Sequence, residues 1–206
     1  MSAGLQWKDK GSTHWDKYSN PEWLKLTIQL PQILDPGTYF NYNTTLAHIL
    51  SVILSKTTNM SALEFANENL FKPLGIKNVK WERDPDGYNI GGFGLSMTAR
   101  DLAKFGYLYL NNGYWSNSSI VPEHWVKEST KKHKEVYGAL GYGYLWWTQN
   151  VDGSHSYKAW GRGGQFIVVV PDLDLVIVIT SDIDPPDRET WNYSFIFDAV
   201  ASSVKR

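Results

Sequence analysis

The first two thirds of the chain carry apolar residues at helical spacing, in stretches that Gly, Pro and Asn separate. This pattern predicts short amphipathic helices joined by turns. Two of these helices open on the capping-box sequences Ser61-Ala-Leu-Glu64 and Thr98-Ala-Arg-Asp101, which satisfy free backbone N–H groups at a helix start. The expected helices span residues 22–32, 44–57, 61–71, 98–111 and 122–130. The helical spacing at 44–57 rests on Leu46, Ile49, Leu50 and Ile53, after a cap at Thr44 or Thr45.

The last third changes to short runs of β-branched and aromatic residues, which predict strands. Tight turns at Pro171-Asp172 and between Gly161 and Gly164 would join them. The expected strands span residues 142–149, 156–161, 165–170 and 175–180, and a closing helix runs from 187 or 188 to 204. We therefore expect an α+β fold in a single domain, mainly helical over about 1–135 and built of antiparallel strands and a packed C-terminal helix over about 136–206.

Composition and charge exclude several classes of protein. The 206 residues carry 20 basic and 21 acidic side chains, so the net charge of −1 implies no nucleic-acid partner. The apolar runs are too short to span a membrane, and the first residues lack the pattern of a signal peptide. There is no cysteine, and the five histidines show no metal-ligand spacing, so we expect no disulfide, metal or other cofactor. Any chemistry therefore depends on hydroxyl, carboxylate, His or Lys side chains.

Tyr42 and Thr44 belong to the densest cluster of potentially reactive groups, the segment Asp35-Pro-Gly-Thr-Tyr-Phe-Asn-Tyr-Asn-Thr44. Both would lie at the start of a helix, where nearby cations and the helix N-terminus could lower the pKa of Tyr42 and allow it to move a proton. The alternative is that Tyr42 is a packing aromatic residue and Thr44 a helix cap.

Two glycine-rich segments are the other candidates. In Ala159-Trp160-Gly161-Arg162-Gly163-Gly164, glycines beside a strand would let a ligand approach the backbone, whose N–H groups could hold an oxyanion. An ordinary bulged hairpin explains this segment equally well. Residues 91–96, Gly-Gly-Phe-Gly-Leu-Ser, form a flexible loop before a capped helix but lack the Gly-Lys-Ser/Thr of a phosphate loop. Ser96 misses the second glycine of a nucleophile elbow, which favours a structural role.

In their order and spacing, these segments resemble the penicillin-recognising serine hydrolases, the β-lactamase and penicillin-binding-protein family, and especially its class C β-lactamase and esterase branch. The segments that carry the resemblance are Met1-Ser-Ala-Gly-Leu, Pro36-Gly-Thr-Tyr-Phe-Asn-Tyr42-Asn-Thr44, Phe71-Lys-Pro-Leu-Gly75-Ile, Gly94-Leu-Ser-Met-Thr98-Ala-Arg-Asp101-Leu-Ala-Lys-Phe-Gly106, Gly161-Arg-Gly-Gly-Gln-Phe-Ile and Val170-Pro-Asp-Leu-Asp-Leu-Val. The resemblance covers nearly the whole chain and corresponds to the C-terminal two-thirds of such an enzyme. It implies a β-lactamase/transpeptidase-like fold that lacks its N-terminal helix and first strands.

The resemblance implies roles for residues at two of the family's three motifs. Its Tyr-x-Asn motif corresponds to Tyr42-Asn43-Thr44, with Tyr42 as the proton relay and Thr44 in place of the usual amide. Its Lys-Thr-Gly motif corresponds to Ala159-Trp160-Gly161, where the family's Lys is Ala and Lys158 is adjacent. The N–H of Arg162 would then help to form the oxyanion hole.

The family's nucleophile motif, Ser-x-x-Lys, is absent from its expected place upstream of Tyr42. One such sequence, Ser129-Thr-Lys-Lys132, follows Tyr42 and ends a surface-like helix. The resemblance thus implies a serine hydrolase of ester, amide or β-lactam bonds that works through an acyl-enzyme on a small acyl substrate or a peptide-like ligand, but is inactive alone. The alternatives are a non-catalytic module that binds a peptide or amide, and a structural remnant that folds by oligomerisation. Family members usually work in the bacterial periplasm or outside the cell, but the export signal would lie upstream, so the localisation stays open.

The expected strand at 175–180 is almost entirely apolar, which is typical of a central strand. In the family, the first strand of the sheet lies beside the last, so this chain would leave its last strand as an open edge. We therefore expect that edge to pair with a second copy or with a separate N-terminal segment.

Overall fold

The computed structural model describes residues 1–7, 20, 22–183 and 193–204. The chain divides into two compact units, Met1–Met97 and Thr98–Arg206, each held together by its own contacts. The helices expected at 98–111 and 122–130 thus belong to the same unit as the strands, not to the unit of the preceding helices. The α+β class expected from the sequence is confirmed.

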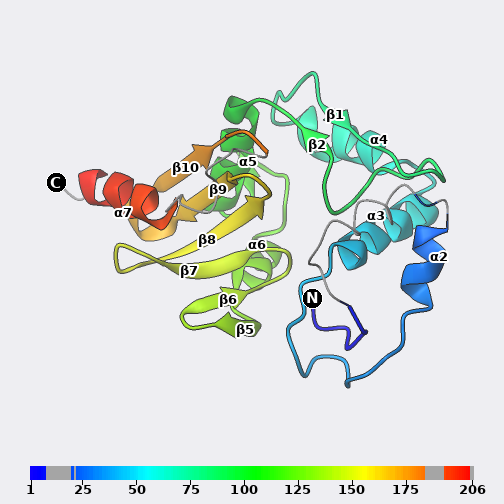
Figure 1. Ribbon diagram of the computed structural model, residues 1–206. Helices are drawn as coiled ribbons and strands as arrows, with labels where there is room; N and C mark the ends of the chain where they lie inside the picture. The colour runs from blue at the N-terminus through cyan, green and yellow to red at the C-terminus, as the bar shows by residue number, and fades with distance from the viewer. Residues whose placement is uncertain (8–19, 21, 184–192, 205–206) are drawn as a thin grey trace. The chain divides into compact units, whose positions relative to one another are not determined.

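The first unit consists of short helices and one small hairpin (Figure 1). Its helix α2 (Trp23–Ile28) packs against α3 (Thr44–Thr58), and α4 (Ala62–Ala66) continues into the π-helical turn η1 (Asn67–Phe71). The expected capping box is present, because the Ser61 hydroxyl accepts from the Glu64 N–H and the Glu64 carboxylate accepts from the Ser61 N–H. Strand β1 (Lys80–Trp81) pairs antiparallel with β2 (Leu95–Ser96).

The apolar residues whose spacing predicts α3 do not form its buried face. Leu50 and Ile53 are 53% and 51% exposed. The buried residues of this helix are Thr45, Ala47, His48, Ser51 and Val52. Polar groups can occupy the buried face because they are hydrogen-bonded there; the Ser51 hydroxyl, for example, donates to the Asn89 carbonyl at 2.7 Å. An apolar stripe on α3 therefore remains on the surface.

The second unit is built on a six-stranded antiparallel sheet in the order β10-β9-β8-β7-β6-β5. Its strands are β5 (Lys134–Tyr137), β6 (Leu140–Tyr142), β7 (Trp147–Val151), β8 (Ser154–Gly161), β9 (Gln165–Val170) and β10 (Leu175–Ile179). Helices α5 (Ala99–Leu110) and α6 (Glu123–Thr130) precede the sheet, with the hairpin of β3 (Tyr114–Trp115) and β4 (Ser118–Ser119) between them. The 3-10 turn η2 (Pro171–Leu173) joins β9 to β10, and α7 (Tyr193–Val204) follows. The expected start of that last helix, at 187 or 188, and its residue Trp191 lie outside the described residues.

The single strand expected at 142–149 is wrong. The structure ends β6 at Tyr142, makes a turn, and begins β7 at Trp147. The turn is closed by the Gly143 N–H, which donates to the Trp146 carbonyl at 2.7 Å. Leu145 in this turn adopts a φ of 66°, which a bulky side chain rarely does. Aromatic alternation continued through the turn, so the pattern concealed it.

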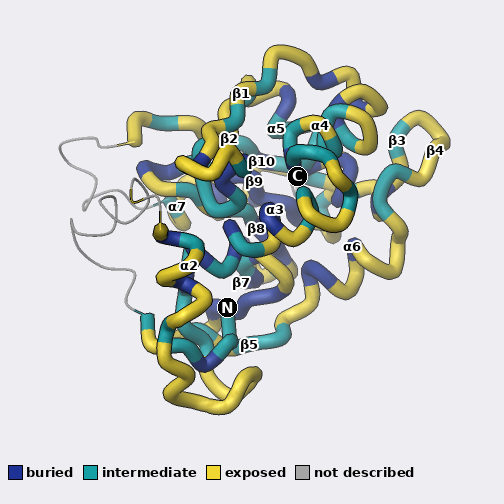
Figure 2. Tube along the Cα trace, turned by 90° about the vertical axis from the view of Figure 1, so that its right-hand side faces the viewer, coloured by how far each residue is buried: buried dark blue, intermediate teal, exposed yellow. Residues whose placement is uncertain are grey.

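Two apolar layers enclose the sheet of the second unit (Figure 1). Phe197 and Ala201 of α7 pack on one face of β9, against Val168 and Val170. Helices α5 and α6 cover the other face, where the apolar cluster consists of Tyr109, Val126, Trp146, Tyr157, Ile167 and Val169. Strand β9 is therefore buried on both faces, as its dark blue trace shows in Figure 2.

Strand β10 lies at the edge of the sheet. Among the strands that the structure describes, it pairs only with β9, from Leu175 opposite Val170 to Ile179 opposite Phe166. Its five apolar residues thus border an edge whose outer N–H and C=O groups face no described strand. In the described part of the chain, no helix has the length and apolar character needed to cross a membrane.

Candidate active site

Tyr42, Asn43 and Thr44 lie at the start of α3. Asn43 is the N-cap of the helix: its backbone is extended, with φ −146° and ψ 101°, and its side-chain oxygen accepts from the Thr45 N–H at 3.0 Å. The cap expected at Thr44 or Thr45 is therefore wrong by one or two residues. Tyr42 and Thr44 are partly buried on either side of the cap, and the helix presents its positive N-terminal end here. The structural role that the alternative interpretation gave to Thr44 belongs to Asn43.

The glycine-rich segment at 91–92 packs directly on the start of α3. A Cβ atom on Gly92 would clash with the Thr44 methyl group and would lie 2.8 Å from the Thr44 carbonyl oxygen. A Cβ atom on Gly91 would clash with the Ala47 carbonyl and would lie 3.0 Å from the Cα atom of His48. Only glycine allows this approach. Two candidate segments that the sequence left separate thus meet within the first unit.

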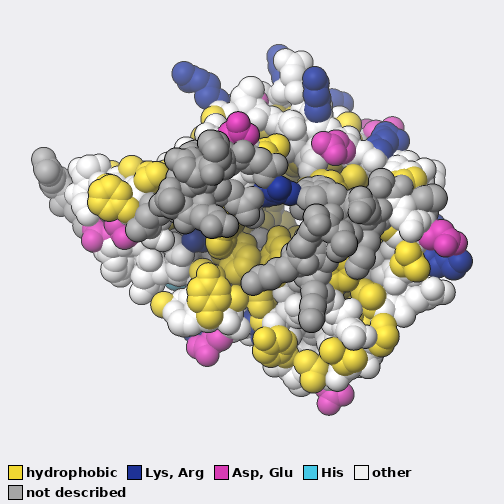
Figure 3. Space-filling model, in the orientation of Figure 1, with side chains coloured by type: hydrophobic (Ala, Val, Ile, Leu, Met, Phe, Trp, Pro, Cys, Tyr) yellow, Lys and Arg dark blue, Asp and Glu magenta, His cyan; other side chains and the backbone are white. Residues whose placement is uncertain are grey.

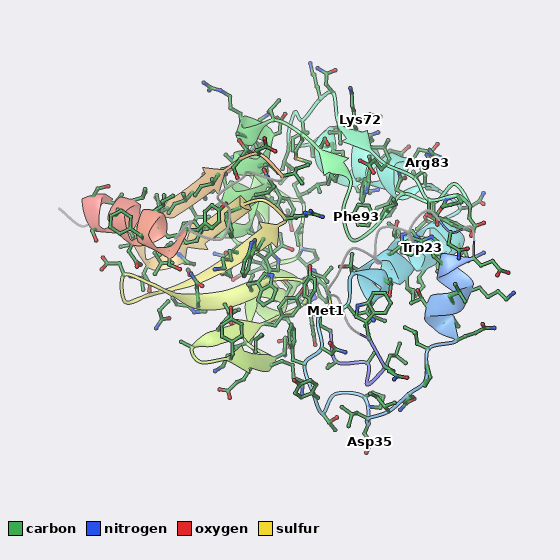
Figure 4. The ribbon with its side chains drawn as sticks, in the orientation of Figure 1. Met1, Trp23, Asp35, Lys72, Arg83 and Phe93 are labelled. Carbon is green, nitrogen blue, oxygen red and sulfur yellow. The ribbon has the colours of Figure 1, made fainter. Side chains whose placement is uncertain are left out.

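A buried pair that the sequence did not indicate supports this contact. His48 Nε2 lies 3.0 Å from Asp84 Oδ2, and the two side chains are 1% and 0% exposed. The His48 ring also stacks on Trp23, with ring centroids 4.1 Å apart. Figure 4 labels Trp23 and Phe93, which belong to the apolar cluster around this pair. The sequence signal was limited to a histidine between the apolar residues Leu46 and Ile49, because Asp84 follows 36 residues later.

Ala159, Trp160 and Gly161 form the end of β8, and Arg162 begins the turn to β9. Gly163 and Gly164 in this turn have φ values of 75° and 89°, which favour glycine. The hydroxyls of Ser181 and Tyr193 both donate to the Gly163 carbonyl, which fixes the turn from outside. The turn is thus rigidly supported, as either an oxyanion site or a structural hairpin would require.

Lys158 lies on the opposite face of the sheet from Ala159, the position that the resemblance assigns to the family's lysine, because successive residues of a strand point to opposite faces. Ala159 packs on the α5 face, among Tyr109 and its neighbours. The Lys158 Nζ atom instead donates to Gln149 Oε1 at 2.6 Å. It lies 5.2–5.9 Å from three aromatic ring centroids, those of Trp160, Phe166 and Phe197. Burial lowers the pKa of Lys158 to about 8.

The Ser129-Thr-Lys-Lys132 sequence does not form a nucleophile pair. Ser129 is 1% exposed and its hydroxyl donates to the Val126 carbonyl at 3.2 Å. Lys132 pairs instead with Glu135 at 3.1 Å. In the third candidate segment, Ser96 is exposed in β2 opposite Lys80. The part of the chain that the structure describes contains no group of His, Asp and Glu side chains that could hold a metal ion.

Comparison with known proteins identifies the family. The family model described as Beta-lactamase matches residues 1–200. The chain belongs to the β-lactamase family. The resemblance stated from the motifs is thereby confirmed.

Individual members of the family agree with this assignment. The 6-aminohexanoate-dimer hydrolase of Paenarthrobacter ureafaciens is 27% identical over 171 residues, which cover 77% of this chain and 43% of that protein. A Bacillus anthracis protein assigned as a 6-aminohexanoate-dimer hydrolase has a solved structure with a TM-score of 0.76 at 25% identity, covering 89% of this chain and 48% of its own. An octameric penicillin-binding protein homologue from Pyrococcus abyssi gives a TM-score of 0.66 at 21% identity, with coverage of 92% and 48%. The chain thus spans less than half the length of these relatives.

The β-lactamase-family match also fixes the fold class. A penicillin-binding protein from Bacillus halodurans superimposes with a TM-score of 0.69 at 16% identity, covering 98% of this chain and 70% of its own. The β-lactamase/transpeptidase-like fold expected from the sequence is confirmed, and this chain corresponds to part of it. The roles of Tyr42, Thr44, Ala159, Trp160, Gly161 and Arg162 stay predictions.

Proposed function

We propose that this chain is the part of a β-lactamase-family serine hydrolase that supplies Tyr42 and the turn after Gly161, and that the complete enzyme cleaves a linear amide or ester. The observation that carries the proposal is the start of α3, where Asn43 caps the helix and Thr44 is not needed for that task. Tyr42 lies directly before this cap, at the positive end of a 15-residue helix. The N-terminal end of a helix stabilises nearby negative charge, which suits a tyrosine that relays a proton.

In the proposed reaction, a serine from an N-terminal segment attacks the acyl carbon of the substrate. Tyr42 accepts the proton of the serine hydroxyl and passes it to the leaving nitrogen or oxygen as the C–N or C–O bond breaks. Water then attacks the acyl carbon of the acyl-enzyme and gives its proton to Tyr42, which passes that proton to the serine oxygen as the acyl C–O bond breaks and the acid departs. N–H groups of the turn after Gly161, that of Arg162 among them, stabilise the oxyanion in both steps.

A linear amide or ester is preferred over a β-lactam for two reasons. The lysine of the third motif is replaced by Ala159, and Lys158 lies on the other face of the sheet. Two of the similar proteins bear the name 6-aminohexanoate-dimer hydrolase, which denotes cleavage of a linear amide. The same substrate class is therefore the first to test here.

The need for a further segment is supported by surfaces of the first unit that remain open. Large apolar side chains are exposed at Leu26, Ile28, Ile33, Leu34, Leu50 and Ile53. In Figure 3, hydrophobic side chains gather over the loop that leads to α3. In addition, the buried Asn43 Nδ2 atom has no hydrogen-bond partner in the described part of the chain. An apolar segment that carries an acceptor would cover the stripe on α3 and satisfy this donor.

The edge of β10 offers a second open surface. An N-terminal segment could account for both this edge and the stripe on α3, whereas a homo-oligomer paired through β10 accounts for the edge alone. We therefore favour the segment. Light scattering distinguishes the two, because a clean monomer at micromolar concentration contradicts pairing between copies.

The test is intact mass after incubation with a fluorophosphonate probe and, separately, with a penicillin. We expect no adduct on the 206-residue chain. We expect one adduct on a fusion to the N-terminal part of the Paenarthrobacter ureafaciens hydrolase, together with faster turnover of 6-aminohexanoate dimer than of a chromogenic cephalosporin. A stoichiometric adduct on the chain alone would overturn the need for a segment, and Ser96 would be mapped first. A fusion that hydrolyses only the cephalosporin would overturn the preference for linear substrates.

A non-catalytic binding module is the second candidate. It is supported by the geometry of Ser129 and Lys132, which do not form a nucleophile pair in the Ser129-Thr-Lys-Lys132 sequence. This function predicts that a peptide or amide ligand protects backbone amides near Tyr42 and Gly161 from exchange, while the fusion shows no turnover. Turnover by the fusion would exclude it.

A further inference from the structure

The hydrogen bonds of His48 define its protonation state. The Gly91 N–H donates to His48 Nδ1 at 3.2 Å, so Nδ1 acts as an acceptor and carries no proton. The proton of the neutral ring is then on Nε2, which donates to Asp84 Oδ2 at 3.0 Å. The second oxygen of Asp84 is also occupied, since Oδ1 accepts from the Tyr88 N–H at 2.7 Å. This arrangement is a neutral imidazole between a carboxylate and a backbone amide.

The surroundings of His48 favour this neutral state. Burial lowers the pKa of His48, and this effect is opposed by the hydrogen bond and the charge of Asp84, then by the Asn89 carbonyl and the charge of Asp86. These two carboxylates are the charged groups that act on the ring, and α2 contributes only the stacked Trp23. A ring protonated on Nδ1 would present an N–H group to the Gly91 N–H, so the contact between them would be lost.

The contact between His48 and Gly91 lies between the two places where the glycine segment touches α3. Gly92 packs on Thr44, one turn before His48, and Gly91 packs on the Ala47 carbonyl. The hydrogen bond from the Gly91 N–H to Nδ1 is a directional contact between the segment and the helix. The hydrogen bond to Nδ1 therefore sets how this segment lies against the first two turns of the helix.

We propose that His48 is a positioning residue, whose Nε2–H tautomer, held by Asp84, pins Gly91 and Gly92 against the start of α3 and so fixes the backbone that presents Tyr42 and Thr44. The importance of Tyr42 and Thr44 rests on the proposed function. The contact itself does not, and it can be tested without any turnover.

Two substitutions distinguish the roles of the two ring nitrogens. In His48→Asn, the amide oxygen occupies the place of Nδ1 and still accepts from Gly91, while the donor to Asp84 is lost. In His48→Gln, the amide nitrogen occupies the place of Nε2 and still donates to Asp84, while the acceptor for Gly91 is lost. We expect the Gly91 amide to exchange about 10-fold faster in the Gln variant, as loss of one hydrogen bond implies, and to stay near the wild-type rate in the Asn variant. The Thr44 methyl resonance should shift in the Gln variant only.

Ring nitrogen NMR of the unmodified chain provides a second measurement, which does not depend on whether a variant folds. We expect Nδ1 in the unprotonated range and Nε2 in the protonated range at neutral pH, and we expect Gly91 protection to fall over the same acidic range in which the ring titrates. A proton on Nδ1 at neutral pH would overturn the proposal. Equal Gly91 exchange in both variants would also overturn it and leave His48 as a packing residue. These results are independent of the labelling and turnover of the fusion, so either proposal can fail alone.

Discussion

Replacing Lys158 by Met should stabilise the protein at neutral pH, and the gain should shrink as the pH rises. Lys158 is 5% exposed, and in the described part of the chain its ammonium group donates to the Gln149 side chain. Met has a similar length and fills the space between the aromatic rings without a charge. It also leaves Gln149, which is only partly buried and can turn toward water. The variant therefore removes the cost of a buried ammonium group with little loss of packing.

The magnitude follows from the pKa of Lys158, which burial lowers from 10.5 to about 8. A lysine with a depressed pKa in the folded state destabilises the protein fully below that value, and the cost disappears as the pH rises through the unfolded value. For this shift the cost is about 3 kcal/mol at pH 7 and about 1 kcal/mol at pH 10. The cation–π contacts of the ammonium group offset roughly 1 kcal/mol of the gain. We expect the variant to be more stable by about 2 kcal/mol at pH 7, and we expect this difference to fall by about 2 kcal/mol toward pH 10.

Urea unfolding of both proteins at several pH values measures this difference. Burial also raises the pKa of Tyr157, but that tyrosine is present in both proteins, so its titration cancels in the comparison. Lys127→Met is the matched control, because Lys127 is 67% exposed and pairs with Glu123 on the surface of α6. It should change stability by less than about 0.5 kcal/mol at every pH. A Lys158→Met difference that does not depend on pH would refute the argument, because it would mean that the amine is not held in an apolar environment.

Three further predictions concern the candidate site. In the active fusion, Tyr42→Phe should lower turnover by about 100-fold or more with unchanged unfolding, and full activity would remove Tyr42 from the mechanism. Gly91→Ala should destabilise the first unit by about 1–3 kcal/mol, because its Cβ would meet the Ala47 carbonyl. The control Gly153→Ala has open space around the new atom and should cost about 1 kcal/mol, because its φ is 79°. Equal losses of stability in calorimetry would contradict the close approach at Gly91. Gly161→Val should slow turnover of the fusion, since even a Cβ would lie 3.1 Å from the Gln165 Cβ, and an unchanged rate would show that the third motif is misplaced.

Elements bounded by strong local signals were predictable from the sequence. The β-branched runs expected at 165–170 and 175–180 are β9 and β10. They were predictable because turn residues bound each run at both ends. The capping box at Ser61 forms as expected because its groups are three residues apart. The turn at Leu145 was missed because its φ of 66° is imposed on a residue that gives no turn signal.

The contacts that shape the candidate site were less predictable. His48 and Asp84 are separated by 36 residues, and nothing in either local pattern indicates the other. The burial of α3 was concealed for a related reason: His48 and Ser51 are buried because Asp84 and Asn89 satisfy them, whereas Leu50 and Ile53 remain exposed. Local periodicity records which face is apolar, but tertiary hydrogen bonds decided which face is buried here.

The third motif shows that even for two adjacent residues the sequence did not indicate which face of the sheet each side chain would occupy. From the sequence alone, Lys158 could take the role of the family's lysine, because it directly precedes Ala159. In the sheet, the register of β8 with β9 places Lys158 opposite Val168 and Ala159 opposite Ile167. Val168 faces α7, whereas Ile167 faces α5, so the two side chains of β8 are separated by the sheet itself. A one-residue shift in the register of β8 would place Lys158 on the Ala159 face. It would also move every other side chain of β8 to the opposite face and expose its apolar residues. The strand register therefore places Lys158 on the opposite face from Ala159, the position that the resemblance assigns to the family's lysine, and the buried surroundings of Lys158 bear on stability.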